Sequence, residues 1–130
     1  MNATKPLSVF LDCTYAIDVV RDALANIVGH SLLRIEGDIG ISYGTRGLSI
    51  EWLVYKDHGL DDDCGIEFSQ YDYQVQLVPL QEGQALPEFN AMYEAIALFV
   101  ASKFSASLEC RSLVVANLQR KVAAFGSRSS

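Results

Sequence analysis

Apolar residues between Thr14 and Val28 recur at the spacing of one helical face. They are Ile17, Val20, Leu24, Ile27 and Val28. Because residues three and four positions apart lie on the same side of an α-helix, this pattern predicts an amphipathic helix over 14–28. We expect Asp12 or Thr14 to cap its start and Gly29 to end it in the left-handed conformation. The apolar segment Leu7–Leu11 fits either a short strand or an entry segment to this helix.

From Ser31 onward the apolar period shortens to two, which is typical of β-strands with one buried face. The alternating groups are Leu33 and Ile35; Ile39, Ile41 and Tyr43; Leu48, Ile50, Trp52 and Val54; Ile66 and Phe68; and Tyr73, Val75 and Leu77. Gly44 and Gly47 bound a segment that we predict to be a hairpin turn, because glycine readily adopts positive φ angles. Consecutive short strands with short connections predict an antiparallel meander.

The last third of the chain begins with a strongly apolar stretch after Pro87, a residue that suits the first turn of a helix. Its apolar residues are Phe89, Met92, Tyr93, Ile96, Phe99, Val100 and Phe104. They cover much of the helix circumference, so we expect this helix to lie deep against the sheet.

The residues after Arg111 fit two structures. The β-branched pair in Leu113–Ala116 suits a strand, but apolar residues at helical spacing also suit a helix. The residues at helical spacing are Val115, Leu118, Val122 and Phe125. We favour a strand over Ser112–Ala116, followed by a short helix capped by Asn117.

These elements predict one globular α+β domain over residues 1–126, with a mainly antiparallel sheet and helices packed on one face. Ser127–Ser130 is expected to be a disordered tail. A chain of 130 residues with 50% hydrophobic content is large enough to bury a substantial core. The residues expected to be buried are Leu24, Ile27, Ile50, Trp52, Phe68, Val75, Leu77, Ile96 and Phe99.

Charge is distributed very unevenly. Between Asp57 and Ser102 there is no lysine or arginine, although the stretch holds nine carboxylates. These are Asp57, Asp61, Asp62, Asp63, Glu67, Asp72, Glu82, Glu88 and Glu94. Because a surface field of one sign attracts opposite charge and repels like charge, this pattern favours a basic protein partner and argues against nucleic acid.

No apolar run approaches the ~20 residues that cross a bilayer, and residues Met1–Leu11 lack the pattern of a secretion signal. We therefore expect a cytoplasmic protein without a membrane partner. Cys13, Cys64 and Cys110 include no C-x-x-C spacing, and reduced thiols are expected in that compartment.

The loop His58–Glu67 gathers acids, an imidazole and a thiol, which are the groups of a metal site or a small enzyme. Its spacing matches neither a calcium loop nor a zinc site, so we predict no metal and no cofactor. Cys64 is the one cysteine in a polar loop, but no oxyanion hole or helix start follows it. We predict a non-enzymatic protein, with a small enzyme built on His58–Glu67 as one alternative and a structural subunit of a larger assembly as another.

The same region holds Tyr71-Asp72-Tyr73, and tyrosine beside aspartate suits a basic protein surface. Alternatively, one of the two tyrosines packs in the core and the other covers a strand edge. The predicted partner-binding residues are Asp57, Asp61, Asp62, Asp63, Glu67, Tyr71, Asp72 and Tyr73.

In size, acidity and layout the chain resembles the immunity proteins of bacterial polymorphic-toxin and contact-dependent growth inhibition systems. The stretches GIEFSQYDYQVQLVPL and SLVVANLQRKVAAF are the most similar to them. The resemblance implies a role as a toxin inhibitor, binding and neutralising a cognate toxin domain that is often a basic nuclease. It transfers no functional residue to this chain.

Overall fold

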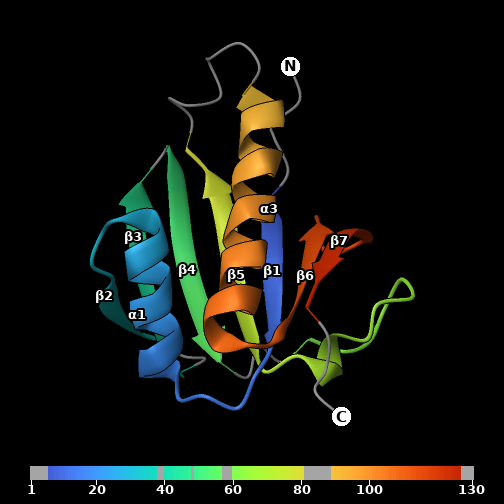
Figure 1. The fold of residues 1–130 in the computed structure, drawn as a ribbon, viewed down its shortest axis with the longest axis horizontal. Helices are drawn as coiled ribbons and strands as arrows, with labels where there is room; N and C mark the ends of the chain where they lie inside the picture. The colour runs from blue at the N-terminus through green and yellow to red at the C-terminus, as the bar shows by residue number, and fades with distance from the viewer. Residues whose placement is uncertain (1–5, 38–39, 48, 57–59, 81–88, 127–130) are drawn as a thin grey trace.

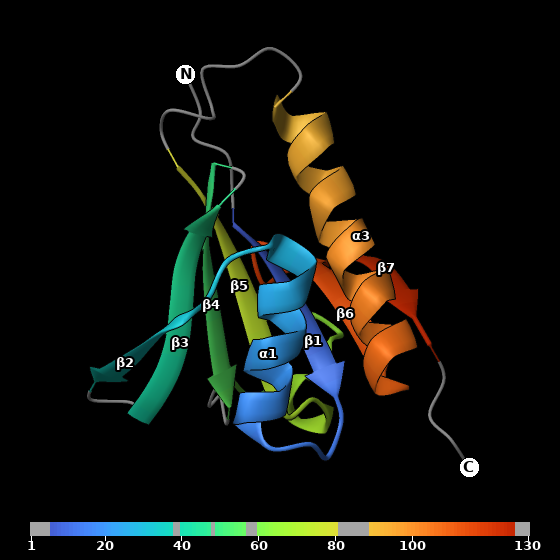
Figure 2. The ribbon, with the colours of Figure 1, turned by 60° about the vertical axis from the view of Figure 1, so that its left-hand side comes forward.

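The computed structural model describes residues 6–37, 40–47, 49–56, 60–80 and 89–126. They form a seven-stranded antiparallel sheet, two α-helices and a short 3₁₀ helix (Figure 1). In chain order the elements are β1 (Leu7–Asp12), α1 (Ile17–Val28), β2 (Leu33–Gly37), β3 (Gly40–Gly47), β4 (Ile50–Lys56), η1 (Phe68–Gln70), β5 (Tyr73–Pro79), α3 (Phe89–Leu108), β6 (Arg111–Ala116) and β7 (Arg120–Phe125). Both helices lie on the same side of the sheet (Figure 2), which confirms the predicted α+β class.

The sheet order is β2-β3-β4-β5-β1-β6-β7. Strands β2 to β5 form the predicted meander, but β1 enters the sheet between β5 and β6. Leu7–Leu11 is therefore a central strand, and all five of its residues are buried because both of its faces are covered. Such strands show a near-continuous apolar run, here interrupted only by Ser8, instead of alternation. The sequence pattern therefore did not distinguish a strand from an entry segment to the helix.

The main core lies between the sheet and the two helices. It includes Val9, Trp52, Val54, Tyr73, Val75 and Leu77 from the strands, Val20 and Leu24 from α1, and Tyr93, Val100 and Phe104 from α3. Trp52 is fully buried, and its indole Nε1 donates a hydrogen bond to the Gly47 carbonyl at 2.9 Å. The Tyr93 hydroxyl accepts from the Leu7 amide at 2.7 Å and donates to the Leu77 carbonyl at 2.5 Å, so α3 is bonded to two strands.

A second, smaller core lies on the opposite side of the sheet, which we call the far face. Strand alternation places Phe10, Leu113 and Val115 there, and Ile66 and Phe68 cover them from the segment that follows β4. The rings of Phe10 and Phe68 are tilted with their centroids 5.0 Å apart, a favourable arrangement for aromatic pairs.

The predicted turn at Gly44–Gly47 is wrong, because both glycines belong to β3. A Cβ added at Gly44 would lie 2.9 Å from Leu53 Cδ2 and 3.1 Å from Ile35 Cδ1. Gly44 therefore makes room for neighbouring side chains within the strand. The chain reverses after Gly47, where Ser49 has a φ of 60°.

Two further predicted elements are also wrong. Ile66 and Phe68 do not form a strand: Ile66 makes an isolated bridge with Asp63, and Phe68 begins η1. Asn117 does not cap a helix, because residues after it form β7. The positive φ angles of Asn117 (51°) and Leu118 (56°) make a hairpin turn between β6 and β7, and the predicted strand over Ser112–Ala116 is confirmed.

Helix α1 starts later than predicted. Its N-cap is Ala16 and no side chain caps it, so neither Asp12 nor Thr14 has that role. Gly29 ends the helix in the left-handed conformation with a φ of 83°, as predicted.

Of the nine residues expected to be buried, six are buried. They are Leu24, Ile50, Trp52, Phe68, Val75 and Leu77. Ile27 and Ile96 are half-buried, and Phe99 is 52% exposed, which contradicts the prediction. Helix α3 is apolar on almost every side, so its sequence does not indicate which side packs on the sheet. The predictions for Ile39, Leu48, Pro87 and Ser127–Ser130 lie outside the described residues.

Candidate binding surface on the far face

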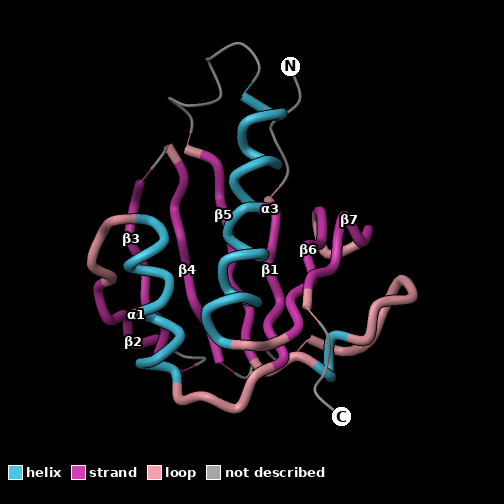
Figure 3. Tube along the Cα trace, in the orientation of Figure 1, coloured by secondary structure: helices cyan, strands magenta, loops and turns pink. Residues whose placement is uncertain are grey.

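The acidic part of the predicted partner-binding region is a surface loop. It belongs to residues 60–72, which we call the acidic segment, between β4 and β5 (Figure 3). Five of its carboxylates are exposed: Asp61, Asp62, Asp63, Glu67 and Asp72. Asp57 and His58 lie outside the described residues.

Two buried side chains fix the acidic segment on the sheet. Ile66 and Phe68 are 1% and 2% exposed and insert into the far-face core. Between Asp63 and Ile66, Cys64 and Gly65 both have positive φ angles and form a tight turn. Backbone hydrogen bonds between Asp63 and Ile66, at 3.1 and 2.8 Å, close this turn. The apolar anchors therefore hold the carboxylates outward on a defined loop.

Asp62 is held more firmly than its exposure suggests. Its Oδ1 accepts a hydrogen bond from the Ser69 amide at 2.9 Å, and bonding to Ser69 lowers the pKa of this carboxyl. Asp63 Oδ1 similarly accepts from the Cys64 amide at 2.8 Å. Both side chains are thus oriented by the backbone of their own segment.

The ion pairs between described residues involve other acids. They are Arg21–Asp22, Arg34–Glu36, Arg46–Glu51 and Arg111–Asp12. Arg111 approaches the acidic segment, but its Nη2 lies 2.9 Å from Asp12 Oδ2 and 3.3 Å from Gln70 Oε1. Its guanidinium also lies over the Tyr71 ring, 5.2 Å from the centroid. Within the described chain, the negative field of the acidic segment is therefore not neutralised by an ion pair.

The two tyrosines of Tyr71-Asp72-Tyr73 have different environments. Tyr71 is half-buried and packs near the Phe10 ring, with a centroid distance of 6.2 Å. Tyr73 is fully buried on the helix side, and its hydroxyl donates to the Tyr15 carbonyl. The prediction that Tyr73 contacts a partner is wrong, because β5 begins at this residue and its side chain alternates into the main core.

The sequence pattern did not predict that side chains on the rest of the far face form an uncovered surface. Sheet register places two rows of side chains across it: Ile35, Ser42, Tyr55, Gln74 and Phe10, and Leu33, Gly44, Leu53, Gln76 and Ser8. Phe10 lies under the acidic segment, whereas Ile35 is 43% exposed and Leu33 is 74% exposed. We call Leu33, Ile35, Leu53, Tyr55 and Gln76 the open half of the far face.

The open half combines apolar and hydrogen-bonding groups. The Tyr55 hydroxyl donates to Gln76 Oε1 at 3.2 Å, and burial raises the Tyr55 pKa. β4, which carries Tyr55, is two strands from β1, which carries Phe10, a separation of about 10 Å. Leu33 and Ile35 lie on β2, four strands from β1, a separation of about 19 Å. The acidic segment and the open half therefore share the far face but lie over different strands. The alternation of apolar and polar residues shows which side of a strand is apolar. It does not indicate which side of the sheet the helices leave uncovered.

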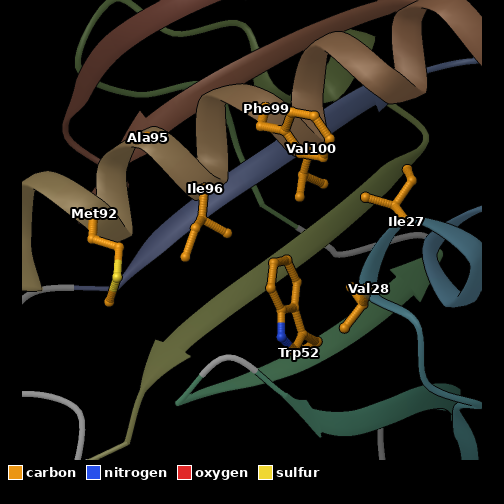
Figure 4. A pocket seen from close by; sticks show the side chains of 8 residues that line it. All are labelled: Ile27, Val28, Trp52, Met92, Ala95, Ile96, Phe99 and Val100. Atoms are coloured by element: carbon orange, nitrogen blue, oxygen red, sulfur yellow. The ribbon is translucent and has the colours of Figure 1, made fainter.

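A second apolar feature lies on the helix side, where α1 and α3 diverge above β4 (Figure 4). It is a cavity of about 240 Å³. Its lining residues are Ile27, Val28, Trp52, Met92, Ala95, Ile96, Phe99 and Val100. Met92 and Phe99 remain exposed beside it, and this lining supplies no carboxylate, imidazole or thiol.

Helix α3 is also long and apolar enough over Ala91–Leu108 to span a membrane, by length and composition alone. A third of this stretch is buried inside the protein. Core helices of soluble proteins meet the same criterion.

In the described part of the chain, no three His, Cys, Asp or Glu side chains gather as metal ligands. Cys64 is exposed, while Cys13 and Cys110 are buried. The enzyme alternative on His58–Glu67 stays a hypothesis, because His58 lies outside the described residues.

Comparisons with known proteins add no relative: no protein-family model, curated protein or solved structure matches this chain. The resemblance to immunity proteins therefore stays a prediction.

Proposed function

We propose that this chain is a non-enzymatic, cytoplasmic binding protein that captures a basic protein on its far face, in the manner of an immunity protein that neutralises a toxin domain. The observation that supports the proposal is that the acidic segment and the open half lie on the same side of the sheet, which the helices leave uncovered. Five exposed carboxylates in the segment that covers β1 and β6 share this side of the sheet with the exposed Leu33 and Ile35 of β2.

The acidic segment is proposed to guide a basic partner to the far face by electrostatic attraction. Its carboxylates attract a basic surface over about 8 Å at physiological ionic strength, and such steering raises association rates by 10-fold or more. A nuclease that grips phosphate presents lysine and arginine around its cleft. An acidic loop held outward by Ile66 and Phe68 can occupy such a cleft in place of the phosphate backbone.

The open half is proposed to hold the bound partner through apolar contacts. Exposed Leu33 and Ile35 lose contact with water when a partner covers them, and Tyr55 adds a rigid amphipathic ring. Residues near the centre of an interface carry most of its binding energy, whereas charges at the rim act mainly on the association rate. The two parts of the surface are therefore expected to have separable kinetic effects.

Affinity capture from the source cell, followed by binding kinetics with the purified captured protein, tests the steering part. The variant D61N/D62N/D63N removes three charges from the acidic segment. The control D18N/D22N/E94Q removes three charges from the helix side, where these residues are also exposed. We expect about a 10-fold slower association and a weaker salt dependence for the first variant only. Equal effects of both variants would show that net charge matters and that the acidic segment does not.

A second pair of variants tests the anchoring part. Ile35→Ser alters the open half, and Phe99→Ser alters an exposed apolar residue on the helix side. If the far face binds the partner, Ile35→Ser should accelerate dissociation by about 5-fold to 30-fold, which corresponds to roughly 1–2 kcal/mol, while Phe99→Ser should leave it unchanged.

The helix-side cavity favours one other function, a structural subunit of a larger assembly. Exposed Met92 and Phe99 beside an apolar cavity are the groups that a neighbouring subunit would cover. The same experiment separates the two functions, because this one requires Phe99→Ser to weaken binding and Ile35→Ser to be neutral.

A further inference from the structure

Cys13 and Cys110 are brought together by the register of the two central strands. β1 and β6 are antiparallel, and their last paired residues are Asp12 and Arg111. One step further, Cys13 follows β1 and Cys110 precedes β6, so the same register places them opposite each other. Antiparallel partners have Cα atoms about 4.5–5.5 Å apart, within the range of about 4.4–6.8 Å that a disulfide spans.

Alternation also directs both thiols to one side. The Asp12 and Arg111 side chains form an ion pair across the strands on the far face, so the next pair faces the helix side. Both cysteines belong to the main core, where they are 6% and 5% exposed. Cys64 is exposed on the acidic segment on the opposite face and is not part of this pair.

The surroundings hold Cys110 in place. Glu109, directly before it, has a positive φ of 51° at the end of α3. The Cys110 thiol lies 3.9 Å from the Phe104 carbonyl, and a Cβ added at Gly126 would lie 2.4 Å from the Cys110 carbonyl oxygen. Hydrogen bonding between the two thiols lowers the pKa of Cys13 and, together with burial, raises that of Cys110. The pair thus has one thiol that ionises more easily and a second that stays protonated beside it.

We propose that Cys13 and Cys110 are a redox-modification site, which a peroxide converts into a reversible disulfide that joins β1 to β6. The Cys13 thiolate attacks one oxygen of hydrogen peroxide, the O–O bond breaks, and the products are a Cys13 sulfenic acid and, after protonation, water. The Cys110 sulfur then attacks the Cys13 sulfur and the S–O bond breaks. The departing hydroxide takes the Cys110 proton and leaves as a second water. Two thiols are oxidised by two electrons in total, and the peroxide is reduced to two waters.

Such a bond would link two strands at the centre of the sheet and close a loop that contains most of the chain. Disulfides that close long loops restrict the unfolded chain strongly and are among the most stabilising. We therefore expect the melting temperature of the oxidised protein to exceed that of the reduced protein by on the order of 10 °C.

The test uses the Cys64→Ser variant, which leaves only this pair, treated in its folded state with hydrogen peroxide. The expected result is loss of both free thiols, a mass lower by two hydrogens, one cross-linked peptide containing Cys13 and Cys110, and recovery of both thiols with dithiothreitol. The matched variants Cys64→Ser/Cys13→Ala and Cys64→Ser/Cys110→Ala should show neither the mass loss nor the rise in melting temperature.

Retention of both thiols, oxidation to sulfinic acid without cross-linking, or links between chains would overturn the proposal. If an alanine variant fails to fold, the peptide map of the oxidised wild-type protein decides instead. A Cys13–Cys110 link supports the proposal, and a link through Cys64 contradicts it.

Discussion

The two sides of the sheet are covered in different ways. On the helix side, α1 and α3 cover a large core in which Trp52 and Tyr93 also satisfy their polar atoms. On the far face, a single loop covers only the area around β1 and β6, and the side chains over β2 to β4 stay partly exposed. The helix side therefore holds most of the buried core, whereas much of the far face stays uncovered.

The largest effect should follow from Trp52→Ala, because this residue is the largest of the fully buried side chains. The substitution opens a cavity under both helices and leaves the Gly47 carbonyl without its indole donor. We expect the free energy of unfolding to fall by about 3–5 kcal/mol, measured by urea denaturation. A loss below about 1 kcal/mol would contradict the assignment of the main core to the helix side.

Phe68→Ala tests the smaller core on the far face. Phe68 is buried against Phe10, but its cluster has few members and lies under a short loop that can collapse. We expect a loss of about 2–3 kcal/mol. Hydrogen exchange should show that amides of residues 60–71 lose protection first, while those of β4 and β5 keep theirs. Equal loss in both regions would show that the two cores unfold as one unit.

Tyr93→Phe separates polar contacts from packing on the helix side. The substitution keeps the ring but leaves the Leu7 amide and the Leu77 carbonyl without their hydroxyl partner. We expect a loss of about 1–2 kcal/mol at neutral pH.

The same residue predicts a pH dependence. Burial raises the pKa of Tyr93 above its ordinary value of about 10. The folded protein therefore disfavours the charged phenolate, and the stability that the neutral hydroxyl contributes is complete below pH 10 and falls as the pH rises above it. Denaturation between pH 9 and 11 should show a steeper decline for the wild-type protein than for Tyr93→Phe. Parallel curves would show that another group controls alkaline unfolding.

Strand and helix patterns in the sequence identify most of the fold. Period-two runs around Trp52 and Val75 and the helical spacing over Ile17–Val28 correspond to real elements, because each has one covered side. The errors have physical causes. β1 is covered on both faces and shows no alternation, and Gly44 serves side-chain packing where a turn was expected.

The proposed binding surface was predictable only in part. Exposed acids in a polar segment follow from their charge, and Asp61 and Asp72 are exposed as expected. The positions of Tyr71 and Tyr73 on opposite sides depend on where β5 begins, and a sequence pattern locates such boundaries poorly. The open half depends on which strands the helices leave uncovered, and this is a property of the sheet order β2-β3-β4-β5-β1-β6-β7.

The smallest effect on stability should come from Phe99→Ser, although the residue is a large aromatic on the most apolar helix. Its side chain is 52% exposed, so little of its apolar area is buried on folding. Serine and phenylalanine have similar helix propensities, and the contact of the Phe99 ring with the Lys103 ammonium, 5.4 Å from the ring centroid, contributes only about 0.5 kcal/mol at an exposed site. Urea denaturation should therefore show a loss below about 1 kcal/mol. A much larger loss would mean that the Phe99 side of α3 is covered, for example by a second copy of the chain. Sedimentation of the wild-type and Phe99→Ser proteins at the same concentrations would then reveal a dimer that the variant lacks.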